Sequence, residues 1–368
     1  MTLGRMIALT TFTVCTVSIS PAQEDHGGAV YTMTNSAQNA ILVFRRSEDG
    51  VLSRSATVPT GGTGTGVNLD SNGALAFNED GRWLFAVNAG SNSISLFRRH
   101  GNDLKLVDTV ASGGVHPVSI TVSEDLVYVL NDGAPANVSG FFFDDDRGVL
   151  YPIANSSRSL STASPDAPEV GFDNTGSLLV VTEKATNLID LFEIRGDGTP
   201  AAPHFQNSNG PTPFGFSFDP RNHLLVTEAF GGEPNKSATS SYEVDDGVNL
   251  ETISASVPTR QTAECWIVIT RNGKFTYGSD TGSGTITGYR IDHDGHLSLL
   301  DPSGISATTG GPTSKPVELA LTRDSSFLYD LNSGNGTLLG WRVKADGRLI
   351  SIRQIEQVPV SATGLVAR

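Results

Sequence analysis

Apolar and polar residues alternate over short runs along most of the chain, with the period of two that is typical of β-strands. One unit recurs: a strand ending in Asn, Asp, Ser or Glu, a polar turn, and a second strand with an aromatic residue near its end. The first strands of these units begin near Val30, Leu84, Val127, Leu178, Leu224, Phe275 and Phe327. After residue 22 we find no apolar stripe of helical period and length. The pattern predicts an all-β fold of seven repeats.

The repeats begin about 50 residues apart, a period that suits one four-stranded propeller blade. Each repeat except the first is preceded by a further apolar run. The first repeat lacks this run, and residues 364–367 supply one that has no other place. We therefore predict a seven-bladed β-propeller of four-stranded blades. Its ring closes where residues 364–367 pair with residues 30–35 in the first blade, because this pairing leaves no sheet edge bare.

The N-terminus differs from the repeats. Arg5 precedes a short, mostly apolar run over residues 6–19, which small residues follow up to Ala22. This run is shorter than the roughly 20 apolar residues of a membrane-spanning helix. We expect residues 1–22 to be a signal peptide, residues 23–368 to form one propeller domain, and the mature protein to be secreted or periplasmic without membrane insertion.

Charge and cysteine content narrow the choice of partners. The formal net charge is −14 at pH 7, with acidic residues spread along the chain, which argues against nucleic acid as a partner.

Cys265 is the only cysteine after residue 22, so the mature protein forms no internal disulfide. The Gly-rich run over residues 60–66 lacks the lysine of a phosphate-binding loop. We expect a monomer without a cofactor.

One face of the predicted ring gathers polar side chains. With strands A to D counted outward from the axis, the B-to-C and D-to-A connections lie on this face. The B strands end there at Asn35, Asn88, Asn131, Glu183, Glu228, Asp280 and Asn332. The D-to-A connections bring His116, Asp166, Glu169, Glu264, Lys315 and Glu318 near the axis. We expect these groups to converge on a central funnel.

Three interpretations of the converging carboxylates stay open. Like charges in a partly buried pocket raise one another's pKa, which makes a carboxylate a proton donor or base near neutral pH. The same oxygens suit Ca²⁺ or a similar hard cation. In the third interpretation, the strand-end Asn and Asp residues cap turns and the Glu residues are solvated around a wet channel.

The repeat resembles the seven-bladed lactonase propellers, a family that includes 6-phosphogluconolactonases and carboxy-cis,cis-muconate cyclases. The resemblance rests on the recurring Leu-Tyr-Val-x-Asn and Ile-x-x-Phe-Arg strands and on the closing Ala-Thr-Gly-Leu-Val-Ala over residues 362–367. It covers nearly all of the chain after residue 22. It implies the seven-bladed fold and a small lactone as substrate.

The resemblance also implies site residues, which match only in part. Glu228, in Leu-Val-Thr-Glu, matches a family glutamate at the end of a B strand. The family Pro-Arg-His that enters the same blade is Pro-Phe-Gly over residues 213–215, and the Ser-Asn-Arg-Gly turn is Ser-Asp-Thr-Gly over residues 279–282. Trp266 takes the place of a family His or Glu, with Glu264 two residues away. The arginines that hold an anionic substrate are therefore missing.

We predict a lactonase or cyclase acting on an uncharged or weakly charged sugar lactone. Glu228 is the expected general acid or base, and His116, Glu169 or Glu264 assist it. The predicted substrate contacts are Asn88, Asn131, Glu183, Trp266, Asp280, Lys315, Glu318 and Asn332. Two alternatives are a non-catalytic propeller that binds a carbohydrate or a protein, and a lactonase in which a divalent cation such as Ca²⁺ polarises the lactone carbonyl.

Overall fold

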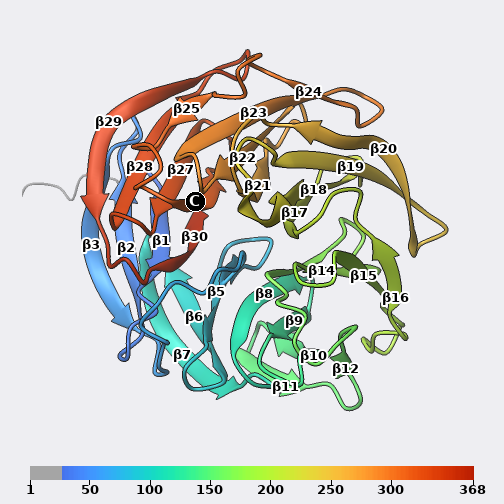
Figure 1. Cartoon of the computed structure of the whole chain (residues 1–368). Coiled ribbons are helices and arrows are strands. Elements are labelled where there is room, and N and C mark those ends of the chain that lie inside the picture. The colour runs from blue at the N-terminus through green and yellow to red at the C-terminus, as the bar shows by residue number, and fades with distance from the viewer. Residues whose placement is uncertain (1–26) are drawn as a thin grey trace, which may run out of the picture.

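A computed structural model describes residues 27–368, which form seven antiparallel sheets arranged in a ring around a central axis (Figure 1). Five sheets have four strands, and two have an additional short strand. The predicted seven-bladed propeller is confirmed. The predicted signal peptide, residues 1–22, lies outside the described residues. No helix within residues 27–368 has the length and apolar character needed to cross a membrane.

The two inner strands of each blade carry the buried core. Strand A lies beside the axis, and in ring order the A strands are β30 (Thr363–Ala367), β4 (Leu75–Phe77), β8 (Pro117–Ser123), β13 (Glu169–Phe172), β17 (Pro213–Phe218), β21 (Glu264–Ile269) and β26 (Pro316–Leu321). The B strands are β1 (Ala29–Met33), β5 (Trp83–Asn88), β9 (Leu126–Asn131), β14 (Leu178–Glu183), β18 (Leu224–Glu228), β22 (Phe275–Asp280) and β27 (Phe327–Asn332). These B strands confirm the seven predicted repeat starts.

The two outer strands of each blade reach the rim of the disc. The C strands are β2 (Ala40–Arg46), β6 (Ser93–His100), β10 (Asn137–Asp144), β15 (Leu188–Glu193), β19 (Ala238–Asp245), β23 (Thr285–Ile291) and β28 (Thr337–Val343). The D strands are β3 (Leu52–Pro59), β7 (Asp103–Ala111), β11 (Val149–Pro152), β16 (His204–Asn207), β20 (Asn249–Pro258), β24 (Leu297–Leu299) and β29 (Leu349–Gln357). Two short strands, β12 (Arg158–Ser159) and β25 (Ala307–Thr308), also pair with C strands, and a 3-10 turn, η1 (Phe230–Gly232), follows β18.

Burial explains why the B strands are the clearest signal in the sequence. Both faces of a blade pack against neighbouring blades, so every residue of β5 and of β22 is buried. Such strands have near-continuous apolar runs. In contrast, the D strand β3 is largely exposed after its first residue. The core therefore lies between the blades and not within any single sheet.

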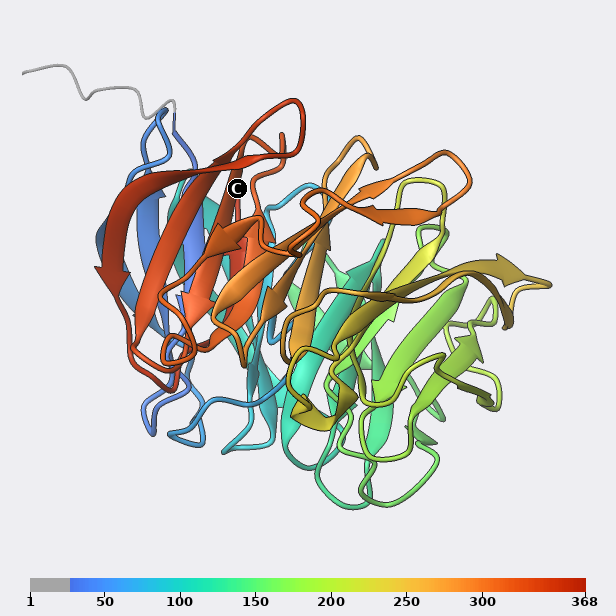
Figure 2. The ribbon, with the colours of Figure 1, turned by 45° about the horizontal axis from the view of Figure 1, so that its top comes forward.

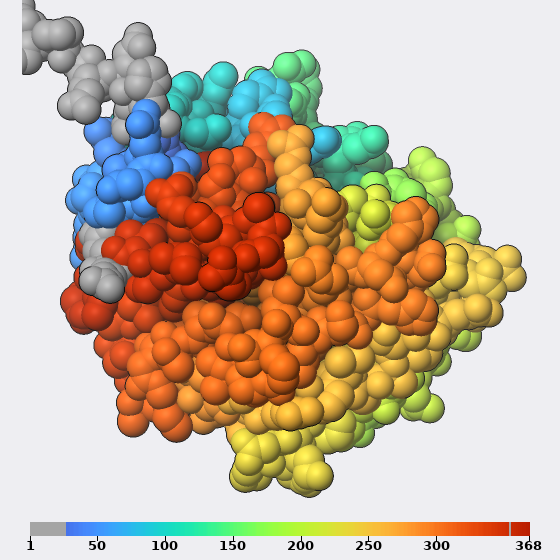
Figure 3. Space-filling view, turned by 90° about the horizontal axis from the view of Figure 1, so that it is seen from above, coloured from blue at the N-terminus to red at the C-terminus, as the bar shows by residue number. Residues whose placement is uncertain are grey.

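The ring closes inside the first blade, as the sequence predicts. Strand β30 pairs antiparallel with β1, with Val30 opposite Ala367 and Tyr31 opposite Val366. The N–H of Ala29 also donates to the carbonyl of Arg368 at 2.9 Å, and the reverse bond measures 2.7 Å. Figures 2 and 3 show the first blade (blue) and the last part of the chain (red) side by side.

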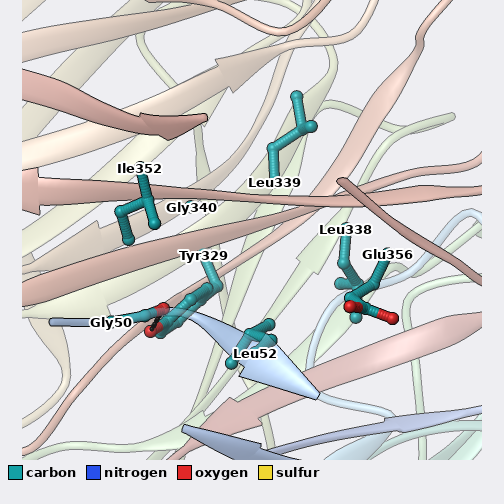
Figure 4. A pocket seen from close by; sticks show the side chains of 8 residues that line it. All are labelled: Gly50, Leu52, Tyr329, Leu338, Leu339, Gly340, Ile352 and Glu356. Carbon is teal, nitrogen blue, oxygen red and sulfur yellow. Dashed lines mark hydrogen bonds between the residues drawn. The ribbon is translucent and has the colours of Figure 1, made fainter. Parts of the chain in front are cut away.

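Buried tyrosines join neighbouring blades at four of the seven junctions. Each hydroxyl on a B strand donates to a backbone carbonyl in the C-to-D hairpin of the next blade. The pairs are Tyr31 with Asn102 (3.0 Å), Tyr128 with Gly198 (2.6 Å), Tyr277 with Gly347 (2.8 Å) and Tyr329 with Gly50 (2.7 Å). The last pair spans the closing junction beside a small cavity of about 10 Å³ (Figure 4). Because buried hydroxyls need a partner, these bonds select how adjacent blades dock.

Deleting residues 360–368 tests the closure. The truncated chain loses β30, which bares the edge of β1 and exposes side chains such as Leu365, which is 5% exposed. We expect the free energy of unfolding in urea to fall by at least about 5 kcal/mol, since each large buried apolar side chain that is lost costs about 2–5 kcal/mol. Val360→Ala, at a position that is 59% exposed, is the control. An unchanged urea midpoint after truncation would show that the ring does not depend on this strand.

Candidate functional site

The predicted site residues lie deeper than an open funnel would place them. Ten of the twelve are buried, at 9% exposure or less: Asn88, Asn131, Glu169, Glu183, Glu228, Glu264, Trp266, Asp280, Glu318 and Asn332. Only His116, which is half-buried, and Lys315, which is exposed, have accessible side chains. The expectation of a solvent-filled funnel lined by all of these groups is therefore corrected.

The residues at the ends of the B strands point toward the preceding blade and bond to their own C strand. In four blades this bond reaches a hydroxyl: Asn88 with Ser95 (2.7 Å), Asn131 with Ser139 (3.1 Å), Glu228 with Ser240 (2.5 Å) and Asp280 with Thr287 (2.9 Å). Glu183 instead accepts the N–H of Ser161 at 2.9 Å and the hydroxyls of Ser161 and Thr186. Asn332 donates to Asp330 on its own strand at 2.6 Å. These side chains therefore brace the interior of each blade.

Glu228 is fully enclosed by such bonds. Its Oε1 accepts the N–H of Gly210 at 2.9 Å and the hydroxyl of Ser240 at 2.5 Å, and its Oε2 accepts the hydroxyl of Ser256 at 2.6 Å. A Cβ at position 210 would lie 2.2 Å from Oε2, so Gly210 is needed for this close approach. Burial raises the pKa of Glu228, and these hydrogen bonds oppose that shift. In this conformation its carboxylate has no exposed surface for a substrate, and its predicted catalytic role stays a prediction.

Glu264 and Asp280 form a buried pair on adjacent strands of the sixth blade, where they are opposite each other in register. The Oε2 of Glu264 accepts the hydroxyl of Thr239 at 2.6 Å and that of Tyr289 at 3.3 Å. Burial raises the pKa of Glu264 to about 8. Burial also raises the pKa of Asp280, and the neighbouring charge of Glu264 adds to that shift. This pair favours the protonated state of its carboxyl groups.

Side chains cross the axis below this face and fill the channel. The indole N–H of Trp266, in the sixth blade, donates to the carbonyl of Ser71 in the loop that enters the second blade, at 2.9 Å. Glu169 accepts the N–H of Phe216 at 2.7 Å, and burial raises its pKa to about 8. Burial raises the pKa of Glu318 as well, and the charge of Glu169 adds to it. Glu169, Trp266 and Glu318 therefore belong to the interior of the ring.

The mouth of the channel is built by one repeated backbone bond. In five blades the residue that follows the B strand donates its N–H to the carbonyl of a residue in the D-to-A connection that has a positive φ. The pairs are Asp132 with His116 (3.0 Å), Lys184 with Asp166 (3.2 Å), Ala229 with Thr212 (2.9 Å), Thr281 with Ala263 (2.9 Å) and Ser333 with Lys315 (2.9 Å). The mouth therefore places His116 beside Asp132 and Asp166 beside Lys184.

Lys184 holds three blades together at this mouth. Its ammonium lies 2.7 Å from the carboxylate of Asp70 and 3.1 Å from that of Asp166. It also lies 4.6 Å from the centre of the Phe214 ring. The lysine side chain is 6% exposed, whereas those of Asp70 and Asp166 are 67% and 61% exposed. The ion pairs are thus buried on one side and open to solvent on the other.

Asp132 is the carboxyl at the mouth with a pKa near neutrality. Its Oδ1 accepts the N–H of Ala167 at 2.8 Å. Burial raises its pKa to about 6, with Asp166 adding to the shift and Lys184 opposing it. Burial lowers the pKa of His116, so this imidazole is neutral at pH 7. We call His116, Asp132, Asp166, Lys184 and Asp70 the mouth cluster.

Sequence reasoning included His116 and Asp166 among the groups near the axis but missed Asp70, Asp132 and Lys184. It selected the last residue of each B strand, although successive residues of a strand point to opposite sides. The sequence did contain a signal for two of the missed residues, because Asp132 and Lys184 directly follow the ends of their B strands. Within residues 27–368, no group of three or more His, Cys, Asp or Glu side chains has the geometry to hold a metal ion.

Part of the sequence is similar to a known family of propellers. Residues 22–164 match the model of the family described as "Lactonase, 7-bladed beta-propeller". The matched segment ends after β12 and so spans three blades in chain order. The predicted resemblance to the lactonase propellers is confirmed. No curated protein matches the chain.

Solved structures share the fold of this propeller over most of its length. A candidate 6-phosphogluconolactonase from Bacteroides fragilis aligns with a TM-score of 0.71 at 18% identity, over 95% of this chain and 100% of its own. The periplasmic gluconolactonase of Pseudomonas aeruginosa aligns with a TM-score of 0.71 at 16% identity, over 93% and 99%. A Lactobacillus plantarum protein aligns with a TM-score of 0.73 at 16% identity, over 93% and 99%. At these identities the likeness shows the fold alone.

The Glu264 carboxyl makes the stability of this propeller depend on pH. The folded state keeps the proton up to about pH 8, whereas the ordinary pKa is 4.5. The stabilisation is therefore complete below the unfolded pKa and is lost as the pH rises toward 8. Above pH 8 we expect the free energy of unfolding of Glu264→Gln to exceed that of the parent by at least about 1 kcal/mol. The magnitude follows because one pKa unit corresponds to about 1.4 kcal/mol.

Thermal unfolding across this pH range measures the effect. Glu243→Gln, which changes an exposed carboxylate on β19, is the matched control and should follow the parent. A parent whose stability rises between mildly acidic and alkaline pH would contradict the assignment.

Proposed function

We propose that this propeller hydrolyses, or by the reverse reaction forms, a small lactone at the mouth cluster, with Asp132 as the general base and acid. The observation that carries the proposal is a half-buried carboxyl with a pKa of about 6 on the face where the connections meet. A catalytic group works best when its pKa lies near the operating pH. The family match over residues 22–164 supports the reaction class.

Asp132 has the chemistry that lactone opening needs. The carboxylate takes a proton from the water molecule that attacks the lactone carbonyl, and a tetrahedral intermediate forms. When the bond between the acyl carbon and the ring oxygen breaks, the same proton passes to the leaving alkoxide. The bond from the N–H of Ala167 to Oδ1 holds the carboxyl in place, so its orientation is set before the substrate binds.

His116 and Lys184 supply the complementary charge stabilisation. The ring of His116 has no hydrogen-bond partner within residues 27–368 in the structure, so its N–H is available to the oxyanion that develops on the carbonyl oxygen. The backbone bond between His116 and Asp132 keeps the two residues adjacent. Lys184 adds a fixed positive charge that its two aspartates orient.

The charge of the mouth favours an uncharged substrate. In the mouth cluster three carboxyl groups, those of Asp70, Asp132 and Asp166, accompany one cation, Lys184. The ammonium of Lys184 is already bonded to both Asp70 and Asp166. An anionic lactone would therefore meet net negative charge and no free guanidinium like those that the family resemblance implies. A neutral sugar lactone is the substrate class that fits best.

Paired variants separate the two candidate bases. The assay is hydrolysis of simple aldonolactones by the purified protein, with spontaneous hydrolysis subtracted. Asp132→Asn should lower turnover on the order of 10² to 10⁴-fold, because the amide cannot carry the proton. Glu228→Gln should leave turnover within a few-fold if Asp132 is the base. Asp246→Asn, in the C-to-D hairpin of the fifth blade on the opposite face, is the control.

Each of the other possible results of this assay supports a different interpretation. Loss of activity in Glu228→Gln with an active Asp132→Asn would assign the proton transfer to Glu228. Activity that a chelator abolishes would support the metal-dependent alternative. No turnover by the parent on any aldonolactone would support a non-catalytic binding protein.

The pH profile is an independent test of the base. Because Asp132 must be ionised to accept a proton, kcat/KM should rise as the pH increases through about 6 and then level off. The measurement covers about pH 4 to 8, which brackets the ordinary range of an Asp carboxyl and the shifted value. A profile without a step near this value would exclude Asp132 as the titrating group.

A further inference from the structure

The rim between the third and fourth blades differs from the other junctions. The outer strands of these two blades, β11 and β16, have four residues each. The outer strand of the sixth blade, β24, has three residues, but β3, β7, β20 and β29 have eight to ten. The junction of the third and fourth blades therefore has a short outer strand on both sides. Strands β11 and β16 each pair with four residues of their C strands, β10 and β15, and both lie at the rim of the ring (Figure 1).

The exposed aromatic side chains of the described chain all belong to these two blades. They are Phe142 on β10, Tyr151 on β11 and Phe205 on β16, with exposures of 39%, 46% and 43%. Aromatic rings elsewhere in residues 27–368 are buried or half-buried. A gathering of exposed rings at one place on a surface marks a binding site more often than scattered single residues do.

Strand register shows that the two rings of the third blade face the fourth. Phe142 is paired directly with Tyr151, so both rings lie on one face of the sheet. Gly140, two residues before Phe142, is paired with Tyr128 on the same face. The hydroxyl of Tyr128 donates to Gly198 of the fourth blade, so this face is turned toward that blade.

The ring of the fourth blade faces back toward the third. Gln206 on β16 bonds to the backbone of Leu250 in the fifth blade. Neighbouring residues of a strand point to opposite sides, so Phe205 points toward the third blade. The three rings are thus turned toward one junction, with Phe142 and Tyr151 paired and Phe205 nearer the mouth, opposite Asp190.

The junction between the third and fourth blades also contains a groove with polar walls. A groove of about 340 Å³ lies there, and Phe142 lines it together with Asp125, Thr175, Ser177 and Arg195. Asp125, Thr175, Ser177 and Arg195 are exposed. The groove therefore offers an apolar ring beside a carboxylate, a guanidinium and two hydroxyls.

We propose that this groove binds a neutral carbohydrate chain. One face of a pyranose ring carries C–H groups that pack on an aromatic ring, and its edge carries hydroxyls that both donate and accept hydrogen bonds. Phe142, which lines the groove, and Tyr151, which is paired with Phe142, supply the stacking surfaces. Asp125 and Arg195 supply an acceptor and a donor for the hydroxyls. The Asp125 carboxylate in the groove and the net charge of −14 disfavour a polyanionic glycan.

The carbohydrate groove is separate from the mouth cluster. It is bordered by A-to-B turns (Asp125 and residues 175–177) and by the C-to-D hairpin over residues 194–198, which lie on the face opposite the mouth. The inference is therefore independent of lactone turnover. It predicts that the propeller attaches to a polysaccharide while its mouth stays open to solvent.

Titration calorimetry with neutral oligosaccharides tests the proposal. The probes are the hexasaccharides of cellulose, xylan, β-1,3-glucan and β-1,4-mannan, added to the purified protein. At least one should bind the parent, and Phe142→Ala and Tyr151→Ala should each weaken that binding by about tenfold, as expected for loss of one stacked ring. Ile350→Ala, at a position that is 49% exposed in the seventh blade, is the matched control and should bind like the parent.

The outcomes are distinguishable from those of the lactonase assay. Aldonolactone turnover should be the same in the parent and in all three variants. If Phe142→Ala has a lower melting temperature than the parent, Tyr151→Ala alone decides the result, because its side chain lies on the short outer strand. The proposal is overturned if no probe binds the parent at millimolar concentration, or if the probe that binds does so equally well with both ring variants.

Discussion

The structure depends on closure of the ring through the pairing of β30 with β1. Each blade buries its faces only against its neighbours, so an open ring would leave two blade faces and a strand edge in water. The two reciprocal backbone bonds between Ala29 and Arg368 continue this pairing beyond the strands. Tyr329, which donates to Gly50, holds the same junction farther from the axis. The first and last parts of the chain must therefore meet before the first and seventh blades are fully buried.

Closure also explains why carboxyl groups are tolerated in the interior. Glu228, Glu264 and Asp280 lie between blades where water is excluded, and each accepts at least two hydrogen bonds. Burial raises the pKa of all three. A buried polar group that is hydrogen-bonded costs far less than one that is not. These carboxyl groups stabilise the interior of the propeller, although in the sequence they resemble a set of catalytic residues.

The mouth shows how one backbone pattern serves different chemistry in different blades. The same N–H to carbonyl bond recurs in five blades, but the side chains at the two positions range from Ala229 and Thr212 to Lys184 and Asp166. Both positions are ionisable in the third and fourth blades, with His116 and Asp132 in one and Asp166 and Lys184 in the other, whereas in the seventh blade Lys315 is opposite Ser333. The scaffold is therefore regular, and the chemistry is concentrated on one side of the axis.

The sequence by itself determined the fold, including the seven strand pairs and the closing strand at residues 364–367. Strand periodicity, turn residues and repeat length are local properties of the sequence. The apolar runs of the buried B strands make this repeat easy to recognise. Only the tertiary structure decided which polar side chains meet solvent. Glu228 and Asp280 end their strands as the pattern indicates, yet they face a neighbouring blade. Asp132 and Lys184, one position after the equivalent strand ends, lie at the mouth. This difference of one residue depends on how two blades pack, because packing selects which side of a strand is covered.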